Sequence, residues 1–171
     1  MRGAALLDHR GWWVAAAHGY AGPARTPPSG AGPRRAALAD VKVQTLTAPP
    51  ARLDQELEAA FGPASLVVTT PLADHRYQCF ASEESMVAQA EAWQGVGLIA
   101  PYPLAVQAWL TAQRRAAAEE GVAVVERLGE SLLITVCQGP RVLIYRQTEG
   151  EATGHGQEIR RTLLALAAET A

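Results

Sequence analysis

The sequence is poor in the residues that bind metals, and it has no excess of positive charge. It has two cysteines, Cys79 and Cys137, in no CxxC or CxxH spacing, and its four histidines are scattered, so we expect no bound metal. Lysine occurs once, at Lys42, and the formal net charge is −2. Such a charge gives no bulk attraction to nucleic acid or to anionic lipid, so neither is an expected partner.

Long apolar runs suited to a membrane are also missing. The apolar start is interrupted by the polar residues 8–10, too early for the hydrophobic region of a secretory signal. The longest uncharged run, residues 92–113, has the length of a membrane helix but contains Pro101, Pro103 and three glutamines. We therefore predict a cytoplasmic chain with no membrane span, in reducing surroundings where the cysteines stay free.

What the sequence does contain is enough apolar material for a packed core. Of its 171 residues, 49% are hydrophobic and 19% are charged, which is typical of a globular protein and not of a disordered one. A chain of this length forms one domain, or two small lobes that share a core.

The first two thirds of the chain predict a mixture of strands and helices. RGAALLD and GWWVAAAH predict the two strands of a hairpin, and the Gly- and Pro-rich residues 19–36 predict a long mobile loop. VKVQTLT, SLVVTT and HRYQCF predict three further strands, with a helix over LDQELEAAF. A helix carrying Met86 and Trp93 follows, and a longer one is predicted over about residues 104–120.

The last third predicts three strands and a helix. VVERLGESLLITVCQGPRVLIYR consists of three β-type runs separated by two tight turns. A turn at Gly154 and Gly156 then leads into a helix that ends near Glu169. We divide the chain into a first subdomain, 1–120, which ends in the linking helix, and a second, 121–171, with α/β layering in both.

Several of these segments resemble a known superfamily. GVGLIAPYPLAVQAWLTAQ is similar to the stretch that introduces the linking helix of actin-like ATPases, and VAVVERLGESLLITVCQGPRVLIYRQTEG resembles their second phosphate hairpin. AALLDHRGWWVAAA takes the place of the first phosphate hairpin. More narrowly, the chain resembles the type IV pilus assembly protein PilM and the cytoplasmic domain of the type II secretion protein GspL. The resemblance implies a small actin-like (ribonuclease H-like) α/β fold, with mixed sheets flanked by helices, truncated to about half the size of full-length relatives.

The same resemblance implies where a nucleotide would bind. Asp8 holds the acidic place of the first hairpin, but glycine arrives only at Gly11; in the second hairpin Gly129 aligns, while Arg127 stands where the family has aspartate. A positive charge there opposes the Mg²⁺ that phosphoryl transfer needs. We therefore expect no catalytic residue, no ATPase activity and no cofactor. If ATP and Mg²⁺ were bound after all, the residues implied are Asp8, Gly11, Gly129, Gly154 and Gly156.

Aromatic residues near the first hairpin suggest a surface for a partner. Trp12 and Trp13 are adjacent on one strand and must point to opposite faces of its sheet. One can lie in the core; the other is exposed unless a helix, the loop or a partner covers it. The relatives bind a short N-terminal peptide of the inner-membrane protein PilN in this region. The candidate partner-binding residues are Trp12, Trp13 and Tyr20, then Tyr77 and Trp93.

Three functions remain open at this point. The first is a non-enzymatic cytoplasmic scaffold or adaptor, at the inner-membrane face of a pilus or secretion assembly platform, that docks the tail of a PilN-like partner. The second is an ATP-binding switch of the actin-like superfamily. The third is a self-assembling structural subunit, because exposed strand edges can pair between copies of a chain.

Overall fold

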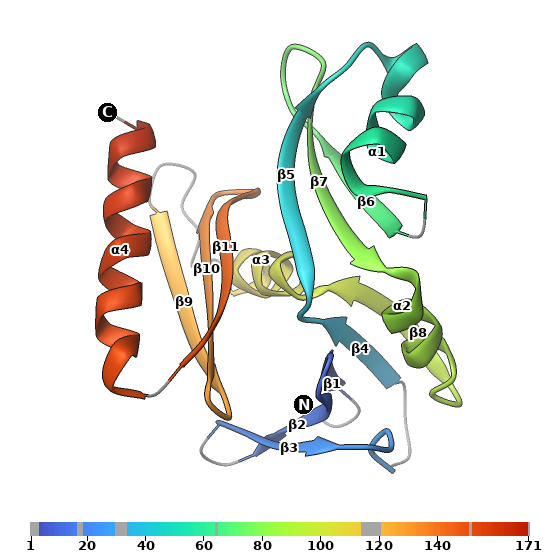
Figure 1. The fold of residues 1–171 in the computed structure, drawn as a ribbon, viewed down its shortest axis with the longest axis vertical. Coiled ribbons are helices and arrows are strands. Elements are labelled where there is room, and N and C mark those ends of the chain that lie inside the picture. The colour runs from blue at the N-terminus through green and yellow to red at the C-terminus, as the bar shows by residue number, and fades with distance from the viewer. Residues whose placement is uncertain are drawn as a thin grey trace.

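A computed structural model describes residues 4–16, 19–29, 34–63, 65–113, 121–150 and 152–170. Within these residues the chain forms eleven strands in three sheets, four α-helices and a short 3₁₀ helix. The expected fold class, mixed α/β with separate sheets flanked by helices, is confirmed (Figure 1). No helix in these parts of the chain is long and apolar enough to cross a membrane.

The first sheet has five strands in the order β3-β2-β1-β4-β8. β1 and β2 are antiparallel, as are β2 and β3, whereas β1 pairs with β4 and β4 with β8 in parallel. The five strands are β1 (Ala4–Asp8), β2 (Gly11–Ala16), β3 (Gly19–Ala24), β4 (Arg34–Leu38) and β8 (Val96–Pro101).

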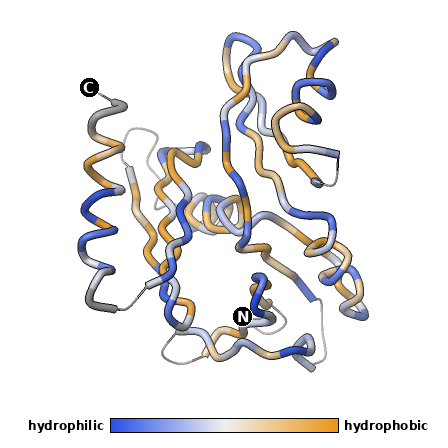
Figure 2. Tube along the Cα trace, viewed as in Figure 1, coloured by the Kyte–Doolittle hydropathy of each residue, from blue (hydrophilic) through white to orange (hydrophobic). Residues whose placement is uncertain are grey.

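Between β4 and β8 the chain makes a separate antiparallel sheet with the order β5-β7-β6. It points away from the rest of the molecule, with α1 against it, and its far end carries mostly hydrophilic residues (Figures 1 and 2). α2 then returns the chain to β8. The elements are β5 (Val41–Thr47), the 3₁₀ helix (Pro50–Arg52), α1 (Leu53–Phe61), β6 (Ser65–Pro71), β7 (Arg76–Glu83) and α2 (Glu84–Glu91).

The third sheet follows α3 and has the order β11-β10-β9. Its middle strand is buried almost throughout, because α4 covers one face while α3 and the first sheet lie against the other (Figure 1). Coverage on both faces explains why this strand is mostly apolar instead of alternating. The elements are α3 (Tyr102–Ala112), β9 (Gly121–Leu128), β10 (Ser131–Gln138), β11 (Arg141–Glu149) and α4 (Ala152–Thr170).

Two apolar cores hold the first sheet, one on each face. On one face Leu7 and Trp12 pack with Met86 and Trp93 of the α2 region. On the other, Leu6 and Trp13 pack with α3 and the third sheet, in the cluster that also contains Tyr102, Val106, Leu110, Leu128, Leu133 and Val142. This second core joins the first sheet and α3 to the third sheet.

Three expectations from the sequence need correction. Residues 19–36 are not one long loop, because Gly19–Ala24 is β3 and β4 begins at Arg34; residues 30–33 lie outside the described part. The linking helix begins at Tyr102 and ends at Ala112, and residues 114–120 also lie outside the described part. The expected turn at Gly154 and Gly156 is helical, since α4 already begins at Ala152.

Candidate functional site

The turn between β1 and β2 is organised around one buried carboxylate. The side chain of Asp8 is fully buried, and its Oδ1 accepts hydrogen bonds from the backbone amides of Arg10, at 2.9 Å, and Gly11, at 3.1 Å. Asp8 therefore satisfies two turn amides that would otherwise be free to approach a phosphate. Gly11 is required for space as well, because a Cβ there would lie 2.5 Å from the carbonyl oxygen of Ala24.

Arg10 occupies the space between the two hairpin turns. Its Nε and Nη2 donate to Asp8 Oδ2 at 2.9 and 2.6 Å, and Nη2 also donates to the carbonyl oxygen of Leu128 at 3.3 Å. The guanidinium lies over the ring of Trp13, with its Cζ 5.0 Å from the centroid. The charge of Arg10 is thus paired with that of Asp8 within the chain. We call this region, residues 8–11 with residues 128–131, the turn junction.

The second hairpin turn closes the junction from the other side. Gly129 has a φ of +63°, which favours glycine. A Cβ at this position would lie 2.8 Å from Cη2 of Trp13, so only a glycine allows the turn to pack this closely against the indole. The side chain of Arg127 is exposed and its Nε donates to the carbonyl oxygen of Gly129 at 2.8 Å. Glu126 lines the opposite face of β9, as strand alternation predicts.

Of the residues implied for nucleotide binding, the structure brings three together. Asp8 and Gly11 meet Gly129 at the turn junction, through Arg10 and Trp13. Gly154 and Gly156 contribute no turn, because they are exposed positions of α4 with open space beside them. Near that end of α4, His155 Nε2 lies 3.2 Å from the carbonyl oxygen of Glu130 and 3.1 Å from that of Gly150. Because a carbonyl oxygen can only accept, Nε2 is the donor in both contacts.

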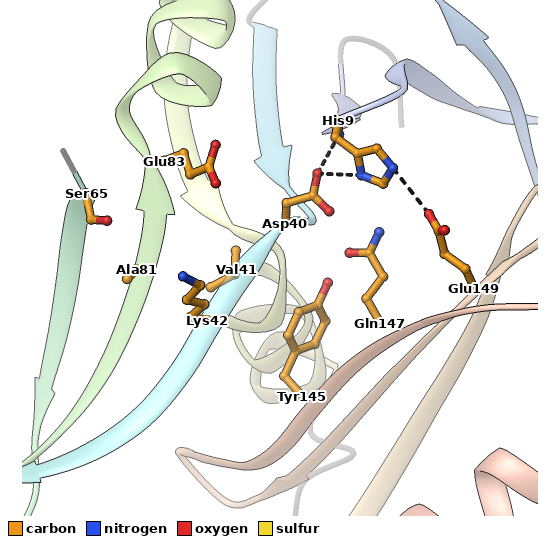
Figure 3. A pocket seen from close by; sticks show the side chains of 10 residues that line it. All are labelled: His9, Asp40, Val41, Lys42, Ser65, Ala81, Glu83, Tyr145, Gln147 and Glu149. Carbon is orange, nitrogen blue, oxygen red and sulfur yellow. Dashed lines mark hydrogen bonds and ion pairs between the residues drawn. The ribbon is translucent and has the colours of Figure 1, made fainter. Parts of the chain in front are cut away.

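A polar pocket of about 390 Å³ lies beside the turn junction, between the second and third sheets (Figure 3). The imidazole of His9 stands at its entrance between two carboxylates, with Nδ1 3.0 Å from Asp40 Oδ2 and Nε2 3.2 Å from Glu149 Oε1. Three carboxylates, with Glu83 as the third, and one ammonium, that of Lys42, line the pocket. Such a lining repels phosphate. No cluster of described residues is arranged to hold a metal ion.

The two adjacent tryptophans do not provide an exposed indole. Their side chains point to opposite faces of the sheet, as predicted, but both faces are covered and the residues are 1% and 3% exposed. The ring of Trp12 makes an edge contact with that of Trp93, at 5.1 Å between centroids, and Trp93 itself is buried. Neither Trp12 nor Trp13 is thus left for a partner to cover, because the α2 region covers one face of the sheet and α3 with the third sheet covers the other.

The two tyrosines proposed as partner contacts are both partly buried, and Tyr20 lines a groove. Tyr77 stands near the start of β7, opposite Leu46 of β5. Tyr20, on the edge strand β3, lines an apolar groove of about 290 Å³ formed by the first sheet, α3 and β9. Its hydroxyl donates to Glu126 Oε1 at 3.1 Å. We call this depression the Glu126 groove.

The wall of the Glu126 groove was not recognised from the sequence. Trp109 of α3, which is 40% exposed, and Val124 of β9 line it together with Tyr20. Burial raises the pKa of Glu126 above its usual value, and burial with the neighbouring carboxylate raises the pKa of Tyr20. The available signal was the alternation of β9, which places Val122, Val124 and Glu126 on one face.

The two cysteines are core residues. Both Cys79 and Cys137 are fully buried and free. Burial raises the pKa of the Cys137 thiol to about 11, and it raises that of Cys79 as well, so neither thiol supplies a thiolate at neutral pH.

Comparisons with known proteins concern the fold. No protein-family model and no curated protein matches the sequence. The structure is similar to a Bacteroides thetaiotaomicron protein of unknown function with an actin-like ATPase fold, at TM-score 0.46 and 10% identity over 81% of this chain and 55% of that chain. It is similar to the PilM–PilN type IV pilus biogenesis complex, at TM-score 0.48 and 19% identity over 78% of this chain and 49% of that chain.

A third similar structure is the cytoplasmic domain of EpsL, an inner-membrane component of the Vibrio cholerae type II secretion system. Its TM-score is 0.48 and its identity 13%, over 88% of this chain and 71% of that chain. The resemblance drawn from the sequence is thus matched by structural similarity to proteins of the same kinds. The chain spans about half the length of the first two of them.

Proposed function

We propose that this chain is a non-enzymatic docking domain, a scaffold or adaptor that holds the cytoplasmic tail of a membrane protein in an assembly platform. The observation that carries the proposal is the position of Arg10. Its guanidinium fills the turn junction, neutralises Asp8 and reaches the carbonyl oxygen of Leu128. The residues of the two turns therefore do not fit Mg-ATP, because the carboxylate that would face the metal is already paired and buried.

The way in which the sheets are joined supports a fixed scaffold. Besides the contact of His9 with Glu149, hydrogen bonds of the described residues join the third sheet to the first two sheets and their turns, each from a side chain to a specific acceptor. Arg10 donates to Leu128, Tyr20 to Glu126, Tyr145 to the carbonyl oxygen of Ala39 at 2.6 Å, and Gln78 to the carbonyl oxygen of Val142. A nucleotide switch works by opening and closing its halves, which would break these contacts.

The setting in a pilus or secretion platform comes from the sequence resemblance and is part of the proposal. It predicts a partner whose tail lies on the cytoplasmic side of the inner membrane, as PilN does in the proposed analogy. The proposed location of this chain is correspondingly the cytoplasm, at the inner-membrane face.

Thermal unfolding with and without millimolar Mg-ATP and Mg-ADP tests the non-enzymatic part. We expect no shift of Tm, because Asp8 already accepts the amides of Arg10 and Gly11 and pairs with the guanidinium of Arg10. A ligand at one hundred times its Kd would add about 2.7 kcal/mol to the free energy of unfolding, which raises Tm by a few degrees in a domain of this size. A shift of that size would overturn the proposal in favour of the ATP-binding switch.

Binding to immobilised peptides, which together cover the cytoplasmic tails of inner-membrane proteins from the same organism, tests the docking part. We expect a small set of tails to bind with nucleotide-independent affinity. Light scattering of the purified protein across a hundredfold range of concentration is measured beside it. A size that grows with concentration, together with no tail bound, would replace docking by self-assembly.

A further inference from the structure

The Glu126 groove has the size of a site for a few side chains. It lies between β1, β3 and β4 of the first sheet, α3, and β9 of the third sheet, and its volume is about 290 Å³. Ligand pockets in proteins are usually about 300–1,000 Å³, so this groove is at the small end of that range. It fits one or two side chains of an extended segment and is too small for a folded domain.

The walls of the groove are apolar, and its rim carries an exposed aromatic. Val106 and Val124 face it from α3 and β9, and Trp109 stands at its side with 40% of its surface exposed. Aromatic side chains that combine a large apolar area with partial exposure are frequent anchors of protein interfaces. A ligand for this groove therefore has apolar side chains.

Glu126 is the single charged residue among the described residues that line the groove. Its carboxylate accepts one hydrogen bond, from the Tyr20 hydroxyl at 3.1 Å, and no arginine, lysine or histidine of the described chain pairs with it. Burial raises the pKa of Glu126 because the charged form is poorly solvated there. The other carboxylate oxygen is left for a donor from outside the chain.

A second polar group in the same wall also lacks a partner. The hydroxyl of Tyr102, at the start of α3, is buried and has no hydrogen-bond partner among the described residues. Buried polar atoms in proteins are nearly always hydrogen-bonded. The groove thus carries a carboxylate with a single hydrogen bond, and Tyr102 in its otherwise apolar lining has a buried hydroxyl with none among the described residues.

The inference rests on the proposed docking function. We propose that the Glu126 groove binds a segment of a partner chain in which one arginine or lysine is flanked by apolar side chains. The cation of that residue pairs with Glu126 beside Tyr20. A cation next to the carboxylate supplies the missing donor. The cation also offsets the cost of burying the charge of Glu126, because opposite charges attract more strongly at a half-buried site than in water. The apolar flanks of the segment then contact Trp109 and Val106.

This chemistry is found at the ends of membrane helices. Segments on the cytoplasmic side of a membrane helix are rich in lysine and arginine, and they directly adjoin apolar sequence. A single carboxylate in an apolar groove is complementary to a basic residue next to apolar ones. The occupant we propose is therefore the membrane-proximal tail of the partner, and a second copy of this chain is treated as an outcome of the test.

The test uses a synthetic six-residue peptide with one central arginine flanked by leucines, capped at both ends. A matched peptide carries citrulline in place of the arginine, which keeps the shape and removes the charge. Binding to the full chain is measured by calorimetry and by tryptophan emission. The emission reports on the groove because Trp109 is exposed while the other three tryptophans are buried. We expect the arginine peptide to bind at least about tenfold more tightly than the citrulline peptide.

Two pairs of variants locate the binding. Glu126→Gln removes the charge but keeps an acceptor for Tyr20, and it should lower the affinity for the arginine peptide to that of the citrulline peptide. Its control is Glu91→Gln, an exposed position at the end of α2. Ala105→Leu fills the groove with a good helix former and should abolish binding of both peptides, whereas Ala108→Leu, exposed on the same helix and outside the groove, should leave it unchanged.

Each remaining outcome overturns the proposal. Equal binding of the two peptides would exclude recognition of a cation, and no binding by either at millimolar concentration would exclude a peptide site. Binding that survives Ala105→Leu would place the site elsewhere. A protein that forms dimers through the groove, detected by dimerisation that Ala105→Leu abolishes, would assign the groove to a second copy.

The failure of this inference can be told apart from failure of the docking function. If tail peptides bind the wild type and all four variants equally, docking stands and the groove is not its site. If Mg-ATP raises Tm while the arginine peptide still binds through Glu126, the non-enzymatic proposal falls and the groove remains.

Discussion

The turn junction and the Glu126 groove both lie where the first sheet meets the third, and they differ in how completely their charges are paired. At the junction, the buried carboxylate of Asp8 receives four hydrogen bonds, all from Arg10 and Gly11. In the groove, Glu126 receives one, from the neutral hydroxyl of Tyr20. A charge whose partners all come from its own chain stabilises a turn and leaves nothing for a ligand. A half-buried charge with a single partner retains the capacity to bind.

The largest expected effect comes from breaking the paired site. Asp8→Asn leaves Arg10 without its counter-ion, and removing one partner of a buried pair costs about 3–5 kcal/mol. Unfolding in urea should show that loss as a lower midpoint with an unchanged slope. Asp54→Asn, at an exposed position of α1, is the control and should change stability by less than about 0.5 kcal/mol.

A double variant sharpens this prediction. When Arg10→Met is added to Asp8→Asn, no unpaired charge remains, so the combined loss should be smaller than the sum of the two single losses. Strict additivity of the two substitutions would mean that the guanidinium and the carboxylate do not act as a pair.

The second largest effect on stability is expected at Gly129, the glycine of the turn between β9 and β10. Gly129→Ala places a methyl group 2.8 Å from the ring of Trp13 and forces a side chain into a left-handed backbone. We expect it to destabilise the protein by about 1–3 kcal/mol. Gly156→Ala is the matched control with the opposite sign: it meets open space within α4 and should stabilise by up to about 1 kcal/mol. Destabilisation by Gly156→Ala would argue against the helix at that position.

The smallest effect is expected in the groove and depends on pH. Because the folded pKa of Glu126 is raised above its unfolded value, the folded state binds the proton more tightly. The contribution of this group to stability is therefore largest below the ordinary pKa of glutamate and decreases as the pH rises through the raised value. The free energy of unfolding, measured from pH 4 to 8, should show this slope in the wild type and in Glu91→Gln, and lose it in Glu126→Gln. A stability of Glu126→Gln well below that of the wild type at pH 7 would contradict the account.

Much of the fold was predictable where local pattern and tertiary environment agree. SLLITVCQ is mostly apolar and β-branched, and it forms a strand covered on both faces. The three strands β3, β4 and β8 were not predicted. GYAGPA consists almost entirely of alanine, glycine and proline, RRAAL has two arginines beside two alanines, and the short apolar run in VGLIAP lies between a glycine and a proline. These segments give a weak local signal for a strand, and here the pairing decides the structure: β3 pairs antiparallel with β2, whereas β4 pairs in parallel with β1 and β8 in parallel with β4.

The candidate site was predictable only in part for the same reason. The motif positions Asp8, Gly11 and Gly129 could be located from the sequence, and Arg10 and Trp13 connect the two turns that carry them. What Arg10 does could not be foreseen, because its contacts with Leu128 and Trp13 join residues distant in the chain or on the far side of a turn. The Glu126 groove is assembled from five strands and a helix, so no local pattern marks it.

The sequence by itself determined the mixed α/β class, the two hairpins and the opposite directions of Trp12 and Trp13, since these follow from local periodicity and turn chemistry. Only the tertiary structure decided that both indoles are buried and that Asp8 is neutralised within the chain. It also decided that Glu126 meets a tyrosine instead of a cation. The physical reason is that burial and charge pairing depend on which distant segments pack together, and the local sequence leaves that choice open.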